Sequence, residues 1–196
     1  MGVNYLRIKR FMDIIITLLF SPIIIPILLL LIIIVIIDDG FPVFFKSKRI
    51  GKNCKSFYMY KLRSMKLNSP VVYNDDGSTK VDKNDFRVTK TGKLLREWSL
   101  DEFPQFWNVL KGEMSIIGPR ASLYEVLDSY TEHEKKKMIL RPGITGYSQA
   151  YYRNSISVKE KRELDVWYVE NVSFLLDLKI LFKTIQSILL RRHVYS

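Results

Sequence analysis

Two adjacent carboxylates, Asp101 and Glu102, lie within the segment WSLDEFPQ at residues 98–105, in a chain that is otherwise strongly basic. A carboxylate among cationic side chains can attack phosphorus or hold a divalent metal ion. It can equally cap a helix: Ser99 and Glu102 fit the Ser-x-x-Glu capping box, and Asp101 alone is a favoured N-cap residue. The interpretations are compatible, because a helix N-terminus offers free N–H groups to a phosphate placed beside it.

The composition narrows the chemistry that these residues can perform. The chain has 196 residues, a formal net charge of +11 and 47% hydrophobic residues, which favours anionic partners such as phosphates, anionic lipid or nucleic acid. Cys54 is the single cysteine, so a disulfide framework and a thiolate metal site are excluded. With only His133 and His193 as histidines, a Ser-His or multi-histidine site is disfavoured. The remaining reactive groups are carboxylates with Lys and Arg as electrostatic partners.

Residues 14–37 form an almost uninterrupted apolar run that predicts membrane attachment. About 24 helical residues reach about 36 Å, enough to cross a ~30 Å hydrocarbon core. Ser21-Pro22 and Pro26 interrupt this run, and Ser21 can supply a hydrogen bond to a carbonyl that a proline leaves without a donor. Both flanks are basic, which suits a re-entrant helix broken at Ser21 and Pro22, with both ends on one membrane face. An ordinary kinked spanning helix is the alternative.

The rest of the chain predicts an α-rich α+β protein, with the membrane helix over 1–38 and a compact domain over 39–196. Two β-prone runs, 42–45 and 56–60, flank a turn at 51–53 and predict a hairpin, and 68–86 reads as a long loop. Helical patterns begin near Thr91 and Phe103 and cover 123–140, 158–169 and 174–190. The last of these is a basic amphipathic helix, which either lies in a membrane interface or packs on the core.

Basic residues around the acidic pair are candidate phosphate ligands. They are Lys61, Arg96, Arg120 and Arg153. Arg120 belongs to Gly118-Pro119-Arg120, a rigid turn that can aim a guanidinium at phosphate. Asp165 adds to the polar set, and Tyr151-Tyr152 can stack on a base or sugar or pack in the core. Taken one at a time, such residues more commonly have surface or structural roles.

Taken together, these segments resemble motifs of the bacterial sugar transferase family, the small monotopic polyprenyl-phosphate phosphoglycosyl transferases. In family order they are KRFMD at 9–13, SP at 21–22, YKLRSM at 60–65, SLDE at 99–102, NVLKGEMS at 108–115, GPR at 118–120, RPGITG at 141–146 and ELDVWY at 163–168. Each motif is weak alone, but their order along nearly the whole chain is specific.

The resemblance implies transfer of a sugar-1-phosphate from a nucleoside diphosphate sugar, usually a UDP-sugar, to polyprenyl phosphate. Asp101 would form a covalent phosphosugar intermediate with Glu102 as its dyad partner, and Mg²⁺ would bind at this dyad. Lys61, Arg96, Arg120 and Arg153 would contact phosphate. The family also favours the re-entrant helix, amphipathic interfacial helices and a position on the cytoplasmic face of the inner membrane, where capsule, O-antigen, exopolysaccharide or glycoprotein assembly begins.

The expected partners are a nucleoside diphosphate sugar, polyprenyl (undecaprenyl) phosphate and membrane lipid, with nucleic acid excluded and a homodimer left open. Two other functions remain as alternatives. One is a non-catalytic, membrane-anchored basic module that binds anionic lipid, and the other is an inactive scaffold of a glycan-assembly complex.

Overall fold

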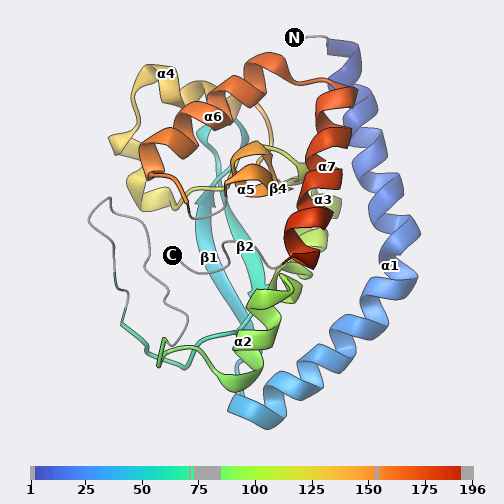
Figure 1. Cartoon of the computed structure of the whole chain (residues 1–196), viewed down its shortest axis with the longest axis vertical. Helices are drawn as coiled ribbons and strands as arrows, with labels where there is room; N and C mark the ends of the chain where they lie inside the picture. The colour runs from blue at the N-terminus through green and yellow to red at the C-terminus, as the bar shows by residue number, and fades with distance from the viewer. Residues whose placement is uncertain (1–2, 71, 73–84, 153–154, 191–196) are drawn as a thin grey trace.

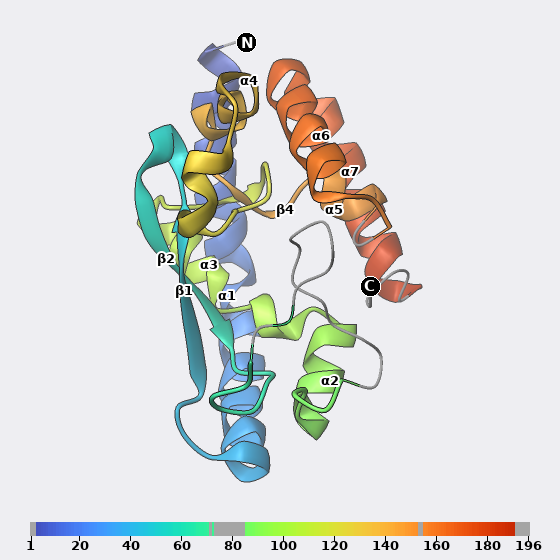
Figure 2. The same ribbon diagram turned by 90° about the vertical axis from the view of Figure 1, so that its left-hand side faces the viewer.

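The computed structural model describes residues 3–70, 72, 85–152 and 155–190. A long helix, α1, runs along one side of the molecule, and the remaining elements pack against its concave face (Figure 1). A view turned by 90° separates a β-hairpin on one side from helices α6 and α7 on the other (Figure 2). The predicted α-rich α+β architecture with a small hairpin is therefore confirmed.

Helix α1 covers Val3–Asp39 and includes Pro22 and Pro26. Figure 1 shows that it bends partway along its length while remaining one ribbon, so the expected break is a bend within a continuous helix. The Ser21 hydroxyl donates to the carbonyl of Leu18 at 2.8 Å, the carbonyl that Pro22 leaves without a helical N–H donor. This confirms the compensating role predicted for Ser21. By length and composition, residues Tyr5–Asp39 are long and apolar enough to cross a membrane.

The part of α1 before Pro22 is called its first leg and the part after Pro26 its second leg, and both are attached to the rest of the protein. In the first leg, Asp13 accepts hydrogen bonds from the Ser115 hydroxyl at 2.8 Å and from the Ile116 N–H at 3.0 Å. In the second leg, Asp38 accepts from the N–H of Thr91 at 2.9 Å. Between these attachments most apolar side chains of the helix are exposed, for example Leu19 at 69%.

The hairpin consists of β1, Phe44–Ile50, and β2, Ser56–Leu62, paired antiparallel from Phe44↔Leu62 to Ile50↔Ser56. A short turn of 3₁₀ helix at Lys52–Cys54 joins the strands, as the sequence predicted. The base of the hairpin shares a hydrophobic cluster with α1, in which Leu62 packs with Leu31 and Val35. The apolar residues of the second leg therefore serve as core as well as surface.

A second, parallel sheet joins β3, Ser115–Ile117, to β4, Gly143–Thr145. The sequence did not predict it, because three-residue strands are too short to show a period-two pattern. The two strands are close enough that a Cβ on Gly143 would lie 2.1 Å from the Gly118 nitrogen. Glycine is therefore required where the turn carrying Arg120 meets β4.

Helix α2, Lys90–Glu97, and helix α3, Gln105–Lys111, lie close to their predicted positions. The prediction of one helix over 123–140 is wrong. That stretch is divided into a 3₁₀ helix at Tyr124–Ser129, the short α4 at Glu132–Lys135 and a second 3₁₀ helix at Lys136–Ile139. Tyr130 is extended, and Thr131 forms a capping box with Glu134 that starts a new helix.

The C-terminal part contains α5, Tyr147–Tyr151, α6, Val158–Asn171, and α7, Phe174–Leu189, the last two as predicted. Helix α7 has two apolar sides. Ile180 is fully buried in a core cluster with Tyr168, whereas Phe182 and Leu189 are each 64% exposed. The expected packing on the core is therefore confirmed for one side. The other side presents apolar surface, and its contact with a membrane interface stays a prediction.

Gly92 packs closely against the backbone at Ser64, so a substitution there tests the packing of α2 against this segment. A Cβ at this position would lie 2.0 Å from the backbone oxygen of Ser64. We expect Gly92→Ala to lower the free energy of unfolding by about 2–3 kcal/mol, because backbone atoms must move to admit the methyl group. Urea unfolding in detergent micelles measures the loss. Lys93→Ala, at an exposed position of the same helix, is the control, and equal stability of the two variants would contradict this packing.

Candidate active site

Asp101 and Glu102 lie in a single 3₁₀ turn, Leu100–Glu102, between α2 and α3. Both capping interpretations are wrong. Ser99 has a left-handed backbone with φ of 56° and its side chain makes no capping hydrogen bond, while α3 begins at Gln105 with Pro104 as its N-cap. Ser99 follows the end of α2 and changes the direction of the backbone, and the next α-helix, α3, begins after the acidic pair. Neither Asp101 nor Glu102 is therefore the N-cap of α3.

Lys61 connects the two carboxylates. Its ammonium nitrogen lies 2.6 Å from Glu102 Oε1 and 3.6 Å from Asp101 Oδ2. Lys61 is next to the last residue of β2, so the hairpin places its side chain over the turn that carries the dyad. The structure thus brings Lys61 next to the acidic pair, and its contact with phosphate stays a prediction.

Asp101 is buried, with 7% of its surface exposed. Burial is the main cause that raises its pKa above the ordinary value for aspartate, and the neighbouring charge of Glu102 acts in the same direction. The positive charges of Lys61 and Arg96 oppose this rise. The site therefore holds a desolvated carboxylate whose charged form depends on nearby cations.

The predicted arginines have different positions. Arg96, in α2, donates from Nε to the Ser64 hydroxyl at 2.9 Å and acts electrostatically on Asp101. Arg120 has an exposed side chain, and its backbone N–H donates to Asp165 at 3.1 Å. Arg153 lies outside the described residues.

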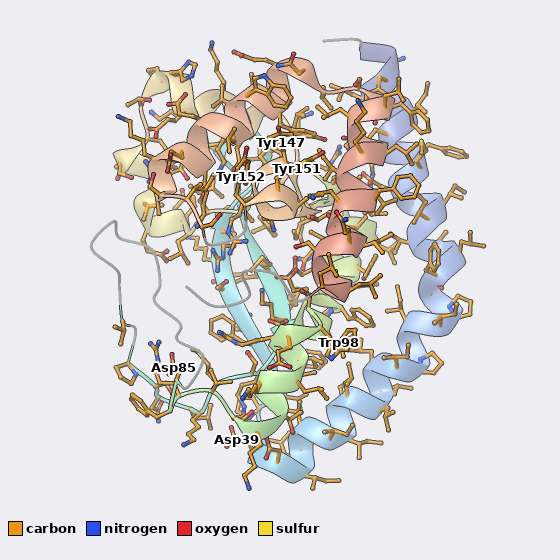
Figure 3. The ribbon with its side chains drawn as sticks, in the orientation of Figure 1. Asp39, Asp85, Trp98, Tyr147, Tyr151 and Tyr152 are labelled. Carbon is orange, nitrogen blue, oxygen red and sulfur yellow. The ribbon has the colours of Figure 1, made fainter. Side chains whose placement is uncertain are left out.

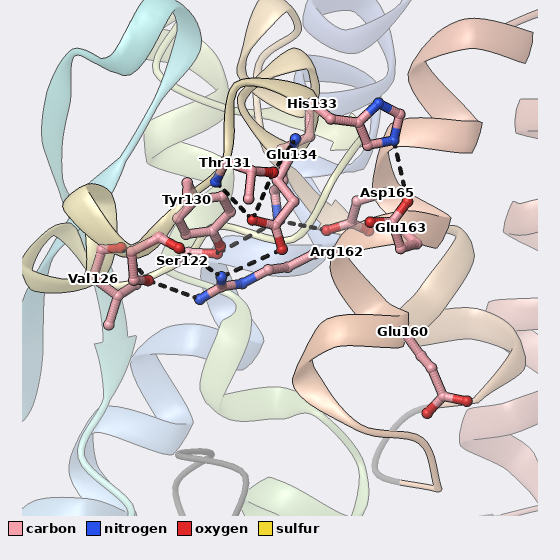
Figure 4. A network of polar contacts seen from close by, with 12 residues as sticks. Ser122, Val126, Tyr130, Thr131, His133, Glu134, Glu160, Arg162, Glu163 and Asp165 are labelled. Atoms are coloured by element: carbon pink, nitrogen blue, oxygen red, sulfur yellow. Dashed lines mark hydrogen bonds and ion pairs between the residues drawn. The ribbon is translucent and has the colours of Figure 1, made fainter.

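Asp165 is part of the support of the site rather than its surface. Figure 4 shows Asp165 in a polar network together with Ser122 and Glu134. The Asp165 carboxylate is 1% exposed and accepts hydrogen bonds from Lys137 Nζ at 2.6 Å and from the Ser148 hydroxyl at 2.9 Å. Together with the Arg120 N–H, these donors fix the loop that presents Arg120. The sequence placed Asp165 in the polar set of the site, and its buried contacts give it a positioning role.

The tyrosines that were candidates for stacking on a ligand lie together on and beside α5 (Figure 3). Tyr147 stacks on Tyr151 with ring centroids 4.7 Å apart and lies 4.8 Å from the ring of Trp167. The rings of this group contact one another, but Tyr151 is 37% exposed, so it does not pack in the core. A contact of Tyr151 or Tyr152 with a base or sugar stays a prediction.

Sequence reasoning missed Arg49, in β1. Its Nη1 donates to the carbonyl of Ala121 at 3.1 Å, and its charge interacts with Glu102 and with Arg120. Burial, followed by the repulsion of Arg120, lowers the pKa of Arg49 to about 10. The hairpin register contains the signal that identifies it: alternation places Arg49 on the same face as Lys61.

The donor set is compatible with Mg²⁺ when substrate phosphates complete the coordination. Among the described residues, no group of three or more His, Cys, Asp or Glu side chains is placed to hold a metal ion. Mg²⁺ sites at phosphate substrates often use one or two carboxylates with phosphate oxygens and water. Asp101 and Glu102 supply two such carboxylates. In this structure both carboxylates lie within ion-pair distance of the Lys61 ammonium.

The buried ion pair between Lys137 and Asp165 allows a test of how Asp165 supports the loop that carries Arg120. Asp165→Ala leaves the Lys137 ammonium buried without its partner, and we expect a loss of about 3–5 kcal/mol in unfolding free energy. Glu163→Ala is the matched control on the same helix, because Glu163 is 49% exposed and contacts only the surface side chain of His133 in the described structure. That change should cost less than about 1 kcal/mol. Similar urea unfolding curves for the two variants would refute the role given to Asp165.

Comparison with known proteins places these features in a family. A family model described as bacterial sugar transferase matches residues 4–191. An uncharacterized sugar transferase, EpsL, from Bacillus subtilis is 47% identical over 150 residues, covering 76% of this chain and 71% of that protein. The exopolysaccharide production protein ExoY of Sinorhizobium fredii is 37% identical over 198 residues, covering 95% of this chain and 88% of that protein.

A longer relative bears a name that states its reaction. The UDP-N-acetylgalactosamine-undecaprenyl-phosphate N-acetylgalactosaminephosphotransferase of Aeromonas hydrophila is 38% identical over 191 residues. The match covers 94% of this chain but 44% of that protein, so this chain spans less than half of its length. The family match extends over the dyad, its cationic neighbours and α1. The chain belongs to the bacterial sugar transferase family.

Proposed function

We propose that this protein transfers a sugar-1-phosphate from a nucleoside diphosphate sugar, a UDP-sugar in particular, to polyprenyl (undecaprenyl) phosphate. The products are polyprenyl-diphosphate-sugar and UMP. The observation that carries this proposal is the buried Asp101 beside Glu102 and Lys61, in a chain of the sugar transferase family. The printed names of relatives, which include undecaprenyl-phosphate phosphotransferases, support the same donor and acceptor classes.

In the proposed first step, an Asp101 carboxylate oxygen attacks the phosphorus that carries the sugar. The bond from this phosphorus to the oxygen bridging to the nucleotide phosphate breaks, and UMP leaves with the electron pair. In the second step, an oxygen of polyprenyl phosphate attacks the same phosphorus and releases Asp101. One site thus serves a soluble donor and a lipid acceptor in turn.

The cationic side chains provide what an aspartate nucleophile requires. A carboxylate approaching a diphosphate meets like charge, so positive groups must neutralise the substrate and the charge that develops on the leaving phosphate. Lys61 is already in contact with both carboxylates, and Arg96 is fixed by Ser64 close enough to act on Asp101. Glu102 shares Lys61 with Asp101 and thereby keeps the ammonium next to the nucleophile.

Mg²⁺ is the proposed cofactor, held by Asp101 and Glu102. When bound, it supplies Lewis-acid neutralisation of the diphosphate oxygens. The flexible chain of Lys61 lets its ammonium also reach a substrate phosphate from its position beside the carboxylates.

For the membrane we propose the re-entrant arrangement, on the cytoplasmic face of the inner membrane. It is supported by the attachment of both α1 legs to the same compact unit, through Asp13 in the first leg and Asp38 in the second. A helix that crossed the bilayer would place one of these ends on the opposite face. The exposed apolar middle of α1 would enter the lipid, and the apolar side of α7 would lie at the interface.

In this role the protein begins the assembly of a surface glycan, such as a capsule, an O-antigen or an exopolysaccharide, or of a glycoprotein. The names of the ExoY relatives favour exopolysaccharide. The alternatives are a membrane-anchored basic module that binds anionic lipid and an inactive scaffold of the assembly complex. Neither of them requires a nucleophile, so substitution of Asp101 separates them from the enzyme.

We expect Asp101→Asn to reduce UMP release from UDP-sugars by at least about a thousandfold, because the amide is not a nucleophile and the residue forms the proposed intermediate. Purified full-length protein, undecaprenyl phosphate and Mg²⁺ are assayed for UMP across a panel of UDP-sugars. Asp128→Asn, an exposed aspartate outside the site, is the control and should keep full activity. Unchanged UMP release by Asp101→Asn would remove the dyad assignment.

The re-entrant arrangement predicts that two engineered cysteines report the same membrane face. In a Cys54→Ser background, Asn4→Cys and Lys52→Cys are exposed to a membrane-impermeant maleimide in intact and in lysed cells. Both positions should be protected in intact cells and labelled after lysis, because both lie in the cytoplasm. Labelling of only one position in intact cells would indicate a spanning helix.

A further inference from the structure

The Arg49 side chain is held by two hydrogen bonds that leave one of its terminal nitrogens without a partner in the described part of the chain. Its Nε donates to the Ser47 hydroxyl at 2.9 Å and its Nη1 donates to the Ala121 carbonyl at 3.1 Å. These two bonds fix the plane of the guanidinium. Within the described residues, Nη2 makes no hydrogen bond and no carboxylate lies within ion-pair distance, so the N–H groups of Nη2 are available.

Two other arginines bind backbone at the ends of elements. Arg63 binds the carbonyls of Asp39 and Gly40 and pairs with the Asp39 carboxylate at 3.1 Å, and Arg141 donates to the carbonyl of Gly112 at 2.7 Å. Arg49 instead stands where its charge acts on Glu102.

A second cation lies beside Arg49. Arg120 is adjacent in sequence to Ala121, whose carbonyl Arg49 binds, and the two arginines repel one another. The Arg120 side chain makes no hydrogen bond or ion pair with a described residue, and its backbone is fixed by Asp165. Glu125 attracts Arg49 but does not form an ion pair with it. Two guanidiniums with unused donors, the fixed one of Arg49 and the exposed one of Arg120, thus lie near one another, and the charge of Arg49 also interacts with Glu125 and Glu102.

We propose that Arg49 and Arg120 together form a phosphate-binding site next to the Asp101–Glu102 dyad, with Arg49 as a direct ligand. This inference rests on the proposed function, because the phosphate is that of the nucleotide donor or of the lipid acceptor. Paired guanidiniums suit such a group: Arg120 can donate two parallel hydrogen bonds to phosphate oxygens, and Arg49 offers the N–H groups of Nη2. The Arg49–Arg120 site is a contact for a substrate phosphate in addition to Lys61, which lies against both carboxylates.

The binding test compares UMP with uridine on the full-length protein in nanodiscs, by calorimetry. Arg49→Ala should weaken UMP binding about tenfold to hundredfold and leave uridine binding unchanged, because only UMP carries the phosphate. Arg49→Lys should recover part of the loss, since the charge remains and the planar fork does not. Lys46→Ala, an exposed cation on the opposite face of β1, is the control and should bind both ligands normally.

Kinetics assign the source of the phosphate. A rise in KM for the UDP-sugar with an unchanged KM for undecaprenyl phosphate assigns the site to the donor. The reverse pattern, with UMP binding unaffected, assigns it to the acceptor. If Arg49→Ala changes neither KM and leaves UMP binding intact, or weakens UMP and uridine equally, Arg49 only supports the Ala121 loop and the proposal is overturned.

The test also separates this inference from the proposed function. UMP binding does not require turnover, so it can be measured in the Asp101→Asn background. Loss of phosphate-dependent binding in Asp101→Asn/Arg49→Ala, relative to Asp101→Asn alone, supports the site even if no UDP-sugar is turned over. Turnover that depends on Asp101 but not on Arg49 supports the function and rejects the site.

Discussion

The burial of the Asp101 carboxylate is the constraint on which the arrangement around it depends. A desolvated negative charge is costly, and the cations that stabilise it must come from rigid elements because flexible ones would lose entropy on each approach. The hairpin supplies Lys61, and α2 supplies Arg96. Neither cation sits on a loop. The carboxylate is thus held ready to ionise in a place that water reaches poorly.

The cations are in turn held by residues that have no part in the chemistry. Ser64 fixes Arg96, and Asp165 fixes the turn that carries Arg120. Such supporting contacts turn flexible side chains into a defined geometry. The small parallel sheet contributes through backbone proximity alone, since β3 and β4 meet where glycine permits. The small size of these elements explains why their sequence signal is weak.

The sequence predicted those elements whose signal lies in a short stretch of neighbouring residues. The hairpin, α2, α6, α7 and the compensating Ser21 follow from periodicity, turn residues and proline chemistry, and the dyad and Lys61 followed from motif order. The helix expected over 123–140 fails because Thr131 starts a new helix, a local rule that the apolar pattern concealed. The cap expected at Ser99 fails because a left-handed backbone takes the chain past the acidic pair. Arg49 needed the strand register, which places it on the face of Lys61.

One contact has a consequence for how the protein is made. Asp177, near the start of α7, accepts hydrogen bonds from Tyr5 in α1 and from Tyr168 in α6, each at 2.6 Å, and the first of these joins residues 172 positions apart. Synthesis runs from the N-terminus, and contacts between distant residues form late because they close a long loop. The contact between the start of α1 and α7 can therefore form only after nearly the whole chain has been synthesised. A chain truncated before Asp177 would leave Tyr5 without the carboxylate that joins α1 to the C-terminal helices.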